Sequence, residues 1–273
     1  MIDILFLAHK RPEFTRASLK ALLENTDLSL HGVDGETSST DNRLWMMTDG
    51  DLETFGEYQD HPLLAGISAR RHGGPVACLN GMMLDDGGVW CHPEAEFLCK
   101  IDNDTIVPPG WLPACLDLMR RYPNVDLLGI EPWTPDEKLF RRWRHPFEPG
   151  EQLWSLTPRP VSHIGGIGLF RRSAFERFGR PAPNSKDRRY GFTEWQWQHP
   201  GMVKAFIDPP LPVFLLDHLP FEPWVSLSAK YEAEGIQRPH GWTYELKHRA
   251  LWEWFSSGEN AAKTGDAVGG PRL

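Results

Sequence analysis

The chain has 273 residues, of which 40% are hydrophobic and 24% charged, the composition of an ordinary globular protein. No apolar run approaches the roughly 20 residues that span a bilayer, and the apolar N-terminus lacks the basic region of a signal peptide, so we expect no integral membrane association. The net charge of −8 disfavours a protein whose main task is to coat nucleic acid.

Strands and helices alternate in the first part of the sequence. A continuous apolar run predicts a buried strand over residues 2–8, and Pro12 begins a helix that reaches about residue 25. The further strands that we expect there cover residues 43–48, 66–70, 96–101 and 125–130, and the further helices cover residues 76–84 and 111–121. This order predicts an α/β fold on a largely parallel sheet.

The pattern changes after residue 131. Residues 133–160 are rich in Pro, Trp and Arg without a clear period, and residues 161–170 read as a strand whose glycines let another backbone or a ligand approach. The remaining predicted elements are helices at 173–178, 193–198, 226–234 and 242–255, and short strands at 205–207 and 213–216. Residues 258–273 read as a flexible tail.

Two carboxylates follow the strand predicted at residues 96–101, in Lys100-Ile101-Asp102-Asn103-Asp104. In an extended chain Asp102 and Asp104 project to the same side, where they repel unless a cation lies between them. Mg²⁺ or Mn²⁺ bound by such carboxylates and by substrate phosphates is the usual solution. The motif therefore predicts a metal and phosphate site, and the alternative is a solvated acidic turn.

Charge and tryptophan divide the chain unevenly. Residues 1–107 carry 8 Lys and Arg against 18 Asp and Glu, whereas residues 108–273 carry 21 against 19. The first part holds only 2 of the 12 Trp and 4 of the 24 Pro. An acidic front could not hold a diphosphate directly, so this imbalance also favours a bound metal ion.

The order of five segments resembles that of family 2 glycosyltransferases with the GT-A fold. These segments are His9-Lys10-Arg11-Pro12, Thr48-Asp49-Gly50-Asp51, Gly73-Gly74-Pro75 with Asn80, the motif around Asp102, and the run from Gly165 to Arg172 followed by Gly191-Phe192-Thr193-Glu194. The resemblance covers about residues 2–218 and implies a single compact domain with a mixed, mostly parallel central sheet flanked by helices. Residues 1–107 would bind the nucleotide sugar, residues 108–257 would bind the acceptor, and residues 258–273 would be a flexible C-terminal tail.

The same resemblance implies roles for individual side chains. The donor and substrate contacts that it implies are Ala8, His9, Arg11, Asp49, Arg71 (or Arg70), Asn80, Asp102, Asn103, Gly166 and Trp195. Asp102 would face the ribose or the metal, Asp104 would bind the metal directly, and His218 would complete the coordination. The implied cofactor is Mn²⁺ or Mg²⁺, and the implied donor is a nucleotide-diphosphate sugar, a UDP-sugar in the first place.

The acceptor side departs from the family pattern at one position. An acidic pair normally follows the Gly-aromatic turn, and here it reads Glu194-Trp195, so the usual Asp is missing. Glu194 is the candidate general base, with Asp208 and Asp217 as alternatives. Flat aromatic faces stack on sugar rings, which makes candidates of Trp195 and of Trp133, Trp143, Trp154, Trp197 and Trp224. The basic runs 138–145 and 186–189 fit either an anionic ligand or a solvated surface.

These features predict a metal-dependent, inverting glycosyltransferase that acts on a hydroxyl of a saccharide, a protein, a lipid or a modified nucleobase. The alternatives are a nucleotidyltransferase of sugar phosphates and a catalytically degenerate carbohydrate-binding protein. The sequence has no P-loop and neither an H-E-x-x-H nor a G-x-S-x-G motif. Its four cysteines form no C-x-x-C pair, which favours free thiols in the cytoplasm.

Overall fold

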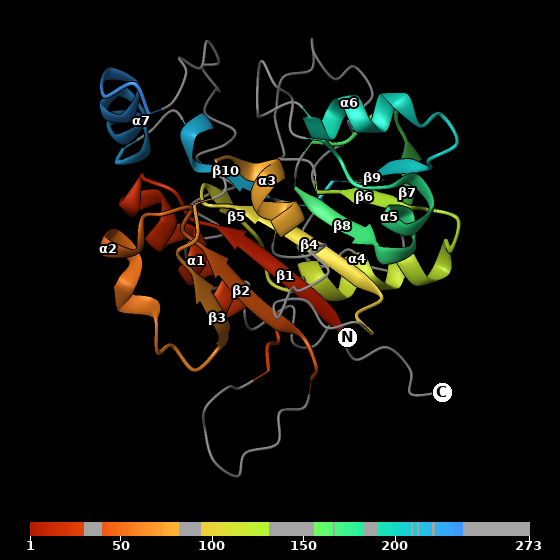
Figure 1. Cartoon of the computed structure of the whole chain (residues 1–273), viewed down its shortest axis with the longest axis horizontal. Helices are drawn as coiled ribbons and strands as arrows, with labels where there is room; N and C mark the ends of the chain where they lie inside the picture. The colour runs from red at the N-terminus through yellow and green to blue at the C-terminus, as the bar shows by residue number, and fades with distance from the viewer. Residues whose placement is uncertain are drawn as a thin grey trace.

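A computed structural model of the chain describes residues 1–29, 40–71, 73–81, 94–130, 156–165, 167–182, 191–208, 210–211, 213–219 and 222–236. Its centre is an eight-stranded mixed sheet in the order β3-β2-β1-β4-β8-β6-β9-β7, with helices packed against it (Figure 1). A second, two-stranded sheet joins β5 (Thr105–Ile106) to β10 (Phe214–Leu215). The predicted α/β architecture with a mixed, mostly parallel sheet is confirmed.

The first half of the sheet is entirely parallel. Its four strands are β3 (Leu64–Ser68), β2 (Arg43–Met47), β1 (Ile2–Leu7) and β4 (Phe97–Asp102). Their carboxyl ends therefore meet at one edge of the sheet, which is the edge where open α/β sheets collect ligands. The turns that follow these strands carry most of the donor-side residues predicted from the sequence.

The second half of the sheet mixes directions. The strand β8 (Gly168–Arg171) runs antiparallel between β4 and β6 (Leu127–Gly129), and β9 (Lys204–Asp208) lies parallel to β6. The outermost strand, β7 (Thr157–Pro160), pairs antiparallel with β9. Prolines cannot donate to a sheet ladder and are confined to edge strands, so this Pro-rich segment could not be recognised as a strand from its composition.

Helices cover both faces of the sheet. The helices are α1 (Pro12–Asn25), α2 (Leu52–Phe55), α3 (Pro75–Leu79), α4 (Trp111–Arg121), α5 (Arg172–Phe178), α6 (Gly191–Gln198) and α7 (Trp224–Ala233), with short 3₁₀ turns η1 (Gly56–Tyr58) and η4 (Leu216–His218). One apolar cluster joins β1 to α1 and α4, and another joins it to α3, α5 and α6. The continuous apolar sequence of β1 is explained because both of its faces are buried.

The sequence located most of these elements within two or three residues. The predicted helix over 111–121 matches α4, and the helix from Pro12 to residue 25 matches α1. The strand predicted at 66–70 lies two residues earlier, and the strand predicted at 161–170 forms only from Gly168 onward. The helix predicted at 242–255 and the tail at 258–273 lie outside the described residues. Within the described ranges, no helix is long and apolar enough to cross a membrane.

Gly168 confirms that a glycine of this segment permits a close backbone approach. Its φ is +152°, and a Cβ added there would lie 2.2 Å from the carbonyl oxygen of Leu128 on β6. Because the obstacle is backbone of the neighbouring strand, neither partner can move aside without breaking the ladder.

We expect Gly168→Ala to lower the free energy of unfolding by about 3 kcal/mol or more, at the upper end of overpacking costs. Urea denaturation measures this change. The matched control is Gly201→Ala, since an added Cβ there meets no described atom within 4 Å, and its effect should stay within about 0.5 kcal/mol. Equal losses for the two variants would contradict the close approach at Gly168.

Candidate functional site

The turn between β1 and α1 has an unusual backbone that is held from outside. Lys10 and Arg11 both have positive φ, 51° and 53°, a region that non-glycine residues seldom occupy. The side-chain amide of Asn103 donates to the carbonyl oxygens of His9 at 3.3 Å and Lys10 at 3.2 Å, and to Thr15 Oγ1 at 2.9 Å. Asn103 is only 4% exposed, so the structure gives this predicted donor contact the role of positioning the turn.

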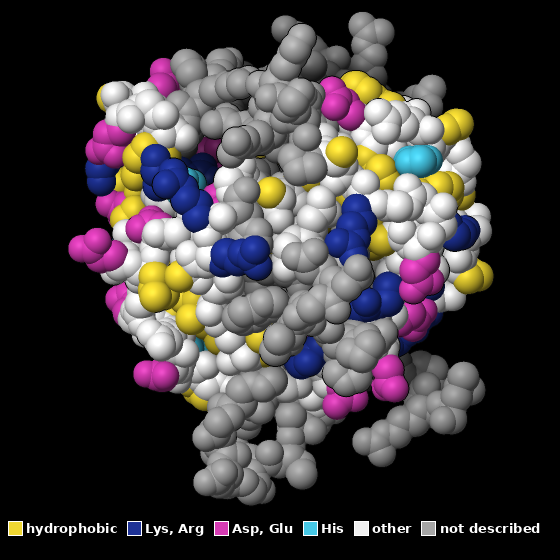
Figure 2. Space-filling model, in the orientation of Figure 1, with side chains coloured by type: hydrophobic (Ala, Val, Ile, Leu, Met, Phe, Trp, Pro, Cys, Tyr) yellow, Lys and Arg dark blue, Asp and Glu magenta, His cyan; other side chains and the backbone are white. Residues whose placement is uncertain are grey.

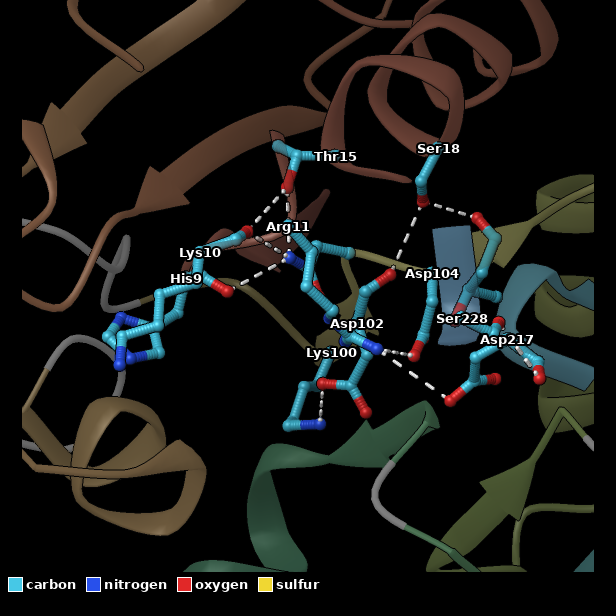
Figure 3. Close-up of polar contacts among 12 residues, drawn as sticks. His9, Lys10, Arg11, Thr15, Ser18, Lys100, Asp102, Asp104, Asp217 and Ser228 are labelled. Atoms are coloured by element: carbon cyan, nitrogen blue, oxygen red, sulfur yellow. Dashed lines mark hydrogen bonds and ion pairs between the residues drawn. The ribbon is translucent and has the colours of Figure 1, made fainter. Parts of the chain in front are cut away.

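Arg11 points from this turn into a group of carboxylates (Figure 3). Its Nη1 lies 2.9 Å from Asp104 Oδ2 and 3.7 Å from Asp217 Oδ2, while its Nη2 donates to Asn103 Oδ1 at 2.6 Å. The guanidinium also lies over the ring of Phe14, 5.5 Å from its centroid. The side chains of Asp104 and Asp217 are 12% and 8% exposed, so this is a largely buried ion cluster.

The small second sheet brings Asp217 to this position. Leu215 on β10 pairs with Thr105 on β5, and the N–H of Leu216 donates to the carbonyl oxygen of Asp104 at 2.7 Å. The segment that contains Asp217 and His218 is thereby fixed beside the predicted acidic motif. The side chain of His218 lies outside what the structure describes.

Burial and charge oppose each other in this cluster. Burial, together with the neighbouring carboxylates of Asp217 and Asp102, raises the pKa of Asp104 to about 6, although Arg11 acts to lower it. Burial also acts to lower the pKa of Arg11, but Asp104 and Asp217 outweigh it and the pKa is raised. The guanidinium therefore remains charged and stabilises the ionised form of Asp104.

Asp102 has a cation of its own. Lys100, two residues earlier on β4, is 4% exposed, and its Nζ lies 2.5 Å from Asp102 Oδ1. The two side chains share a face of the strand because residues two apart point the same way. About a third of the Asp102 side chain is exposed, 34%, which makes it the most accessible carboxylate of the cluster.

The carboxylates that the sequence predicts as metal ligands already face cationic side chains. A divalent ion needs carboxylate oxygens that are available to it, whereas one oxygen of each carboxylate already faces a cation of the chain. Oδ2 of Asp104 and Oδ2 of Asp217 face Nη1 of Arg11, and Oδ1 of Asp102 faces Nζ of Lys100. In the described part of the chain no three His, Cys, Asp or Glu residues form a group that could hold a metal ion. The side chains described here thus do not fit a divalent ion at Asp104, because Arg11 takes the position of the cation.

Asp49 shapes a second turn at the same edge of the sheet. Its carboxylate accepts hydrogen bonds from the backbone N–H groups of Gly73 at 2.9 Å and Gly74 at 3.2 Å, which fixes the entry to α3. The exposed Arg71 stands over the same turn, where its side chain would lie 3.5 to 3.7 Å from a Cβ added at Gly50. The structure thus brings Asp49 and Arg71 together beside the turn that follows β2.

Other predicted donor residues are placed differently. Ala8 is buried, and its N–H donates to the Met47 carbonyl at 2.7 Å, while His9 is exposed. The amide of Asn80 donates to the Pro181 carbonyl at 2.7 Å, and its buried Oδ1 has no hydrogen-bond partner among the described residues. The predicted positions Gly166, Trp133, Trp143 and Trp154 and the basic runs 138–145 and 186–189 lie outside the described residues.

The two tryptophans of α6, Trp195 and Trp197, have different surroundings. Trp195 is 4% exposed, its ring is stacked on Phe175 at 5.3 Å, and its N–H donates to the Phe178 carbonyl at 3.2 Å. The expectation that Trp195 contacts substrate is therefore corrected, because its ring and its N–H are used in the core. Trp197 is 59% exposed and lies edge-on to the ring of His163 at 5.6 Å.

Two side chains that hold backbone segments in place carried no functional prediction. The buried side chain of Gln196 binds both backbone groups of Ile164, accepting from its N–H at 2.8 Å and donating to its carbonyl at 3.0 Å. Asp51 accepts a hydrogen bond from the backbone N–H of Lys10 at 3.2 Å. The contact between Lys100 and Asp102 could have been predicted, because residues two apart on a strand point the same way. The contact between Gln196 and Ile164 could not, because the two residues are 32 positions apart.

Comparison with known proteins identifies solved structures of similar fold. No protein-family profile and no curated protein matches the sequence. PcManGT, a mannosyltransferase from Pyrobaculum calidifontis solved with GDP-Man and Mn²⁺, is similar with a TM-score of 0.52 and 14% identity over 100% of this chain and 76% of that one. This likeness confirms the GT-A-like fold.

Two structures of TarS from S. aureus are more distant. One, of TarS 1–349, has a TM-score of 0.48 and 10% identity over 92% of this chain and 77% of that one. The other has a TM-score of 0.49 and 11% identity over 100% of this chain and 46% of that one.

The contrast between the tryptophans of α6 is testable. We expect Trp195→Ala to cost about 3–5 kcal/mol of unfolding free energy, as for other buried aromatic side chains. Trp197→Ala should stay within about 0.5 kcal/mol because the ring is mostly in solvent. Thermal or urea denaturation measures both, and a loss at Trp197 as large as that at Trp195 would contradict the packing described here.

Proposed function

We propose that the protein is a family 2-like glycosyltransferase that moves a sugar from a nucleotide-diphosphate donor to an acceptor hydroxyl. The observation that carries this proposal is the gathering of the β1–α1 turn, the Asp49 turn and Asp102 at the carboxyl ends of three adjacent parallel strands. The GT-A-like fold supports it. Residues 1–107 would form the donor half of the site and residues 108–257 the acceptor half.

The donor would lie across the turns that follow β1 and β2. His9 is exposed in the turn after β1, and Asp49 lies in the turn after the neighbouring parallel strand β2. His9 would contact the nucleoside, and the guanidinium of Arg71 would meet the diphosphate. On the face drawn in Figure 2, Lys and Arg side chains spread across the middle, and most of the Asp and Glu lie toward the outline. We propose a UDP-sugar as the donor, and GDP-mannose as the second candidate because PcManGT was solved with GDP-Man.

The acceptor would meet the first turn of α6. Glu194 lies in this turn and is half-buried, and Trp197 is three residues further along the same helical face. In the proposed step the Glu194 carboxylate takes the proton of the acceptor hydroxyl. The hydroxyl oxygen then bonds to the anomeric carbon, the bond from that carbon to the diphosphate breaks, and configuration inverts. Asp217, engaged with Arg11, is a poorer candidate base.

The proposed function does not include the metal ion that the sequence predicts at Asp104. When bound, Mn²⁺ or Mg²⁺ supplies a Lewis acid for the leaving diphosphate. Asp104 and Asp217 are committed to Arg11, so we assign no ion to Asp104. The proposed function depends on side chains of the protein: His9 and Arg71 would bind the donor, and Glu194 would accept the proton.

Two features of the structure bear on the alternative functions and on the cellular compartment. The interpretation as a degenerate carbohydrate-binding protein rested on Trp195 in the place of an acid. Trp195 is a core residue, and the preceding residue, Glu194, supplies a half-buried carboxylate in the first turn of α6. Cys78, Cys99 and Cys115 are buried free thiols, and burial raises the pKa of the Cys78 thiol to about 12. Cysteines that remain free thiols fit a reducing compartment, which supports our proposal of a cytoplasmic enzyme.

A donor panel tests the proposed function directly. We expect one of UDP-, GDP- or TDP-sugars to raise the melting temperature and to be hydrolysed slowly to the nucleoside diphosphate, since a ligand that binds only the folded state stabilises it. Chromatography of the products separates the alternatives, because a nucleotidyltransferase would leave the nucleotide sugar intact and would instead release pyrophosphate when given a nucleoside triphosphate and a sugar phosphate. A panel without stabilisation or turnover would refute the donor site.

The base is tested by Glu194→Gln once an acceptor has been found. We expect transfer to fall by about 10²–10⁴-fold, the usual contribution of a general base, while the donor-induced rise in melting temperature is kept. The matched control is Glu176→Gln on the exposed side of α5, which should transfer at the wild-type rate. Unchanged transfer by the Glu194 variant would remove Glu194 from this role.

A further inference from the structure

The two buried carboxylates of the cluster require a positive charge between them. Asp104 and Asp217 come from different segments, and both approach the same nitrogen of Arg11, at 2.9 and 3.7 Å. Their backbones are held close together, because the N–H of Leu216 donates a hydrogen bond to the carbonyl oxygen of Asp104 and β5 is paired with β10. Ionised carboxylates this close repel unless a cation lies between them.

Arg11 is held in place to supply that charge. Its backbone is in the left-handed region, φ 53° and ψ 56°, directly before Pro12 begins α1. Asn103 binds both the guanidinium and the carbonyls of the turn, and the ring of Phe14 lies below the guanidinium. A backbone conformation of this kind persists only where the surroundings enforce it, and here they direct Arg11 onto Asp104 (Figure 3).

The balance of charge leaves little attraction for a divalent ion. Arg11 and Lys100 face the three carboxylates of Asp102, Asp104 and Asp217, which leaves one negative charge. Without Arg11 two negative charges would remain, the number that a divalent ion neutralises. A guanidinium bound to buried carboxylates is also costly to displace, because its removal leaves an uncompensated buried charge.

We propose that Arg11 is a built-in cation of the donor site, which occupies the position a divalent ion would need between Asp104 and Asp217, and that nucleotide binding here does not require such an ion. The inference rests on the proposed function for the identity of the nucleotide ligand. The occupancy of the carboxylates by Arg11 can be tested without any nucleotide.

The test measures binding of Mn²⁺ alone, followed by the electron paramagnetic resonance signal of the free ion. We expect the wild-type protein and Asp104→Asn to show the same weak binding. Arg11→Met should bind Mn²⁺ about tenfold or more tightly than the wild type, and the double variant Arg11→Met/Asp104→Asn should lose this gain. A merely structural role of Arg11 would not raise the affinity for a metal.

The matched control is Arg16→Met, which removes an exposed arginine of α1 that pairs with Glu57 and should leave Mn²⁺ binding unchanged. Saturable wild-type binding that Asp104→Asn abolishes would overturn the proposal, as would a folded Arg11→Met variant with wild-type affinity. If circular dichroism shows that Arg11→Met does not fold, the comparison of the wild type with Asp104→Asn decides.

A second measurement uses UDP and GDP as probes in a thermal-shift assay. We expect the stabilising nucleotide to raise the melting temperature equally in excess EDTA and in Mn²⁺. A shift that appears only with Mn²⁺ would overturn the inference. Failure of both nucleotides in both buffers would count against the proposed function instead, and the nucleotide-free Mn²⁺ titration would still decide the role of Arg11.

Discussion

The contact of one guanidinium with two buried carboxylates joins three segments of the chain at the carboxyl edge of this sheet. Arg11 comes from the β1–α1 turn, Asp104 from the β4–β5 turn and Asp217 from η4, so the cluster joins segments more than ninety residues apart. Removing one partner of a buried ion pair typically costs about 3–5 kcal/mol, whereas an exposed pair contributes little. The positions of all three turns therefore depend on the same charge.

The neighbouring polar contacts extend this constraint in both directions. Asn103 carries it to the backbone of residues 9 and 10, and Asp51 carries it from there to the end of β2. On the other side, Glu13 on α1 receives hydrogen bonds from Lys230 and Tyr231, which fix α7 against the same helix. Helix α7 is thus linked through α1 to the turn that contains Arg11 (Figure 1).

What the sequence could predict follows from the range of the interactions involved. Helix α4 and strand β1 are set by local periodicity and continuous burial, and their bounds were predicted within a residue or two. The different burial of Trp195 and Trp197 could not be predicted, because the burial of a side chain of α6 depends on its contacts with other helices. Trp195 stacks on Phe175 of α5. The acidic motif was recognised from spacing, but its partner Arg11 lies 93 residues away from Asp104.

The charge of the front half illustrates why a sum over residues is a weak guide to a site. Residues 1–107 carry ten more acidic than basic side chains, which suggested that a metal must accompany any phosphate. The electrostatic field at a buried position is dominated by the few groups within several ångströms, because solvent screens distant surface charges. At Asp104 those groups include Arg11, close enough to form an ion pair. The acidity of the half-chain and the charge of its site are therefore separate quantities, and only the second bears on which cation is needed.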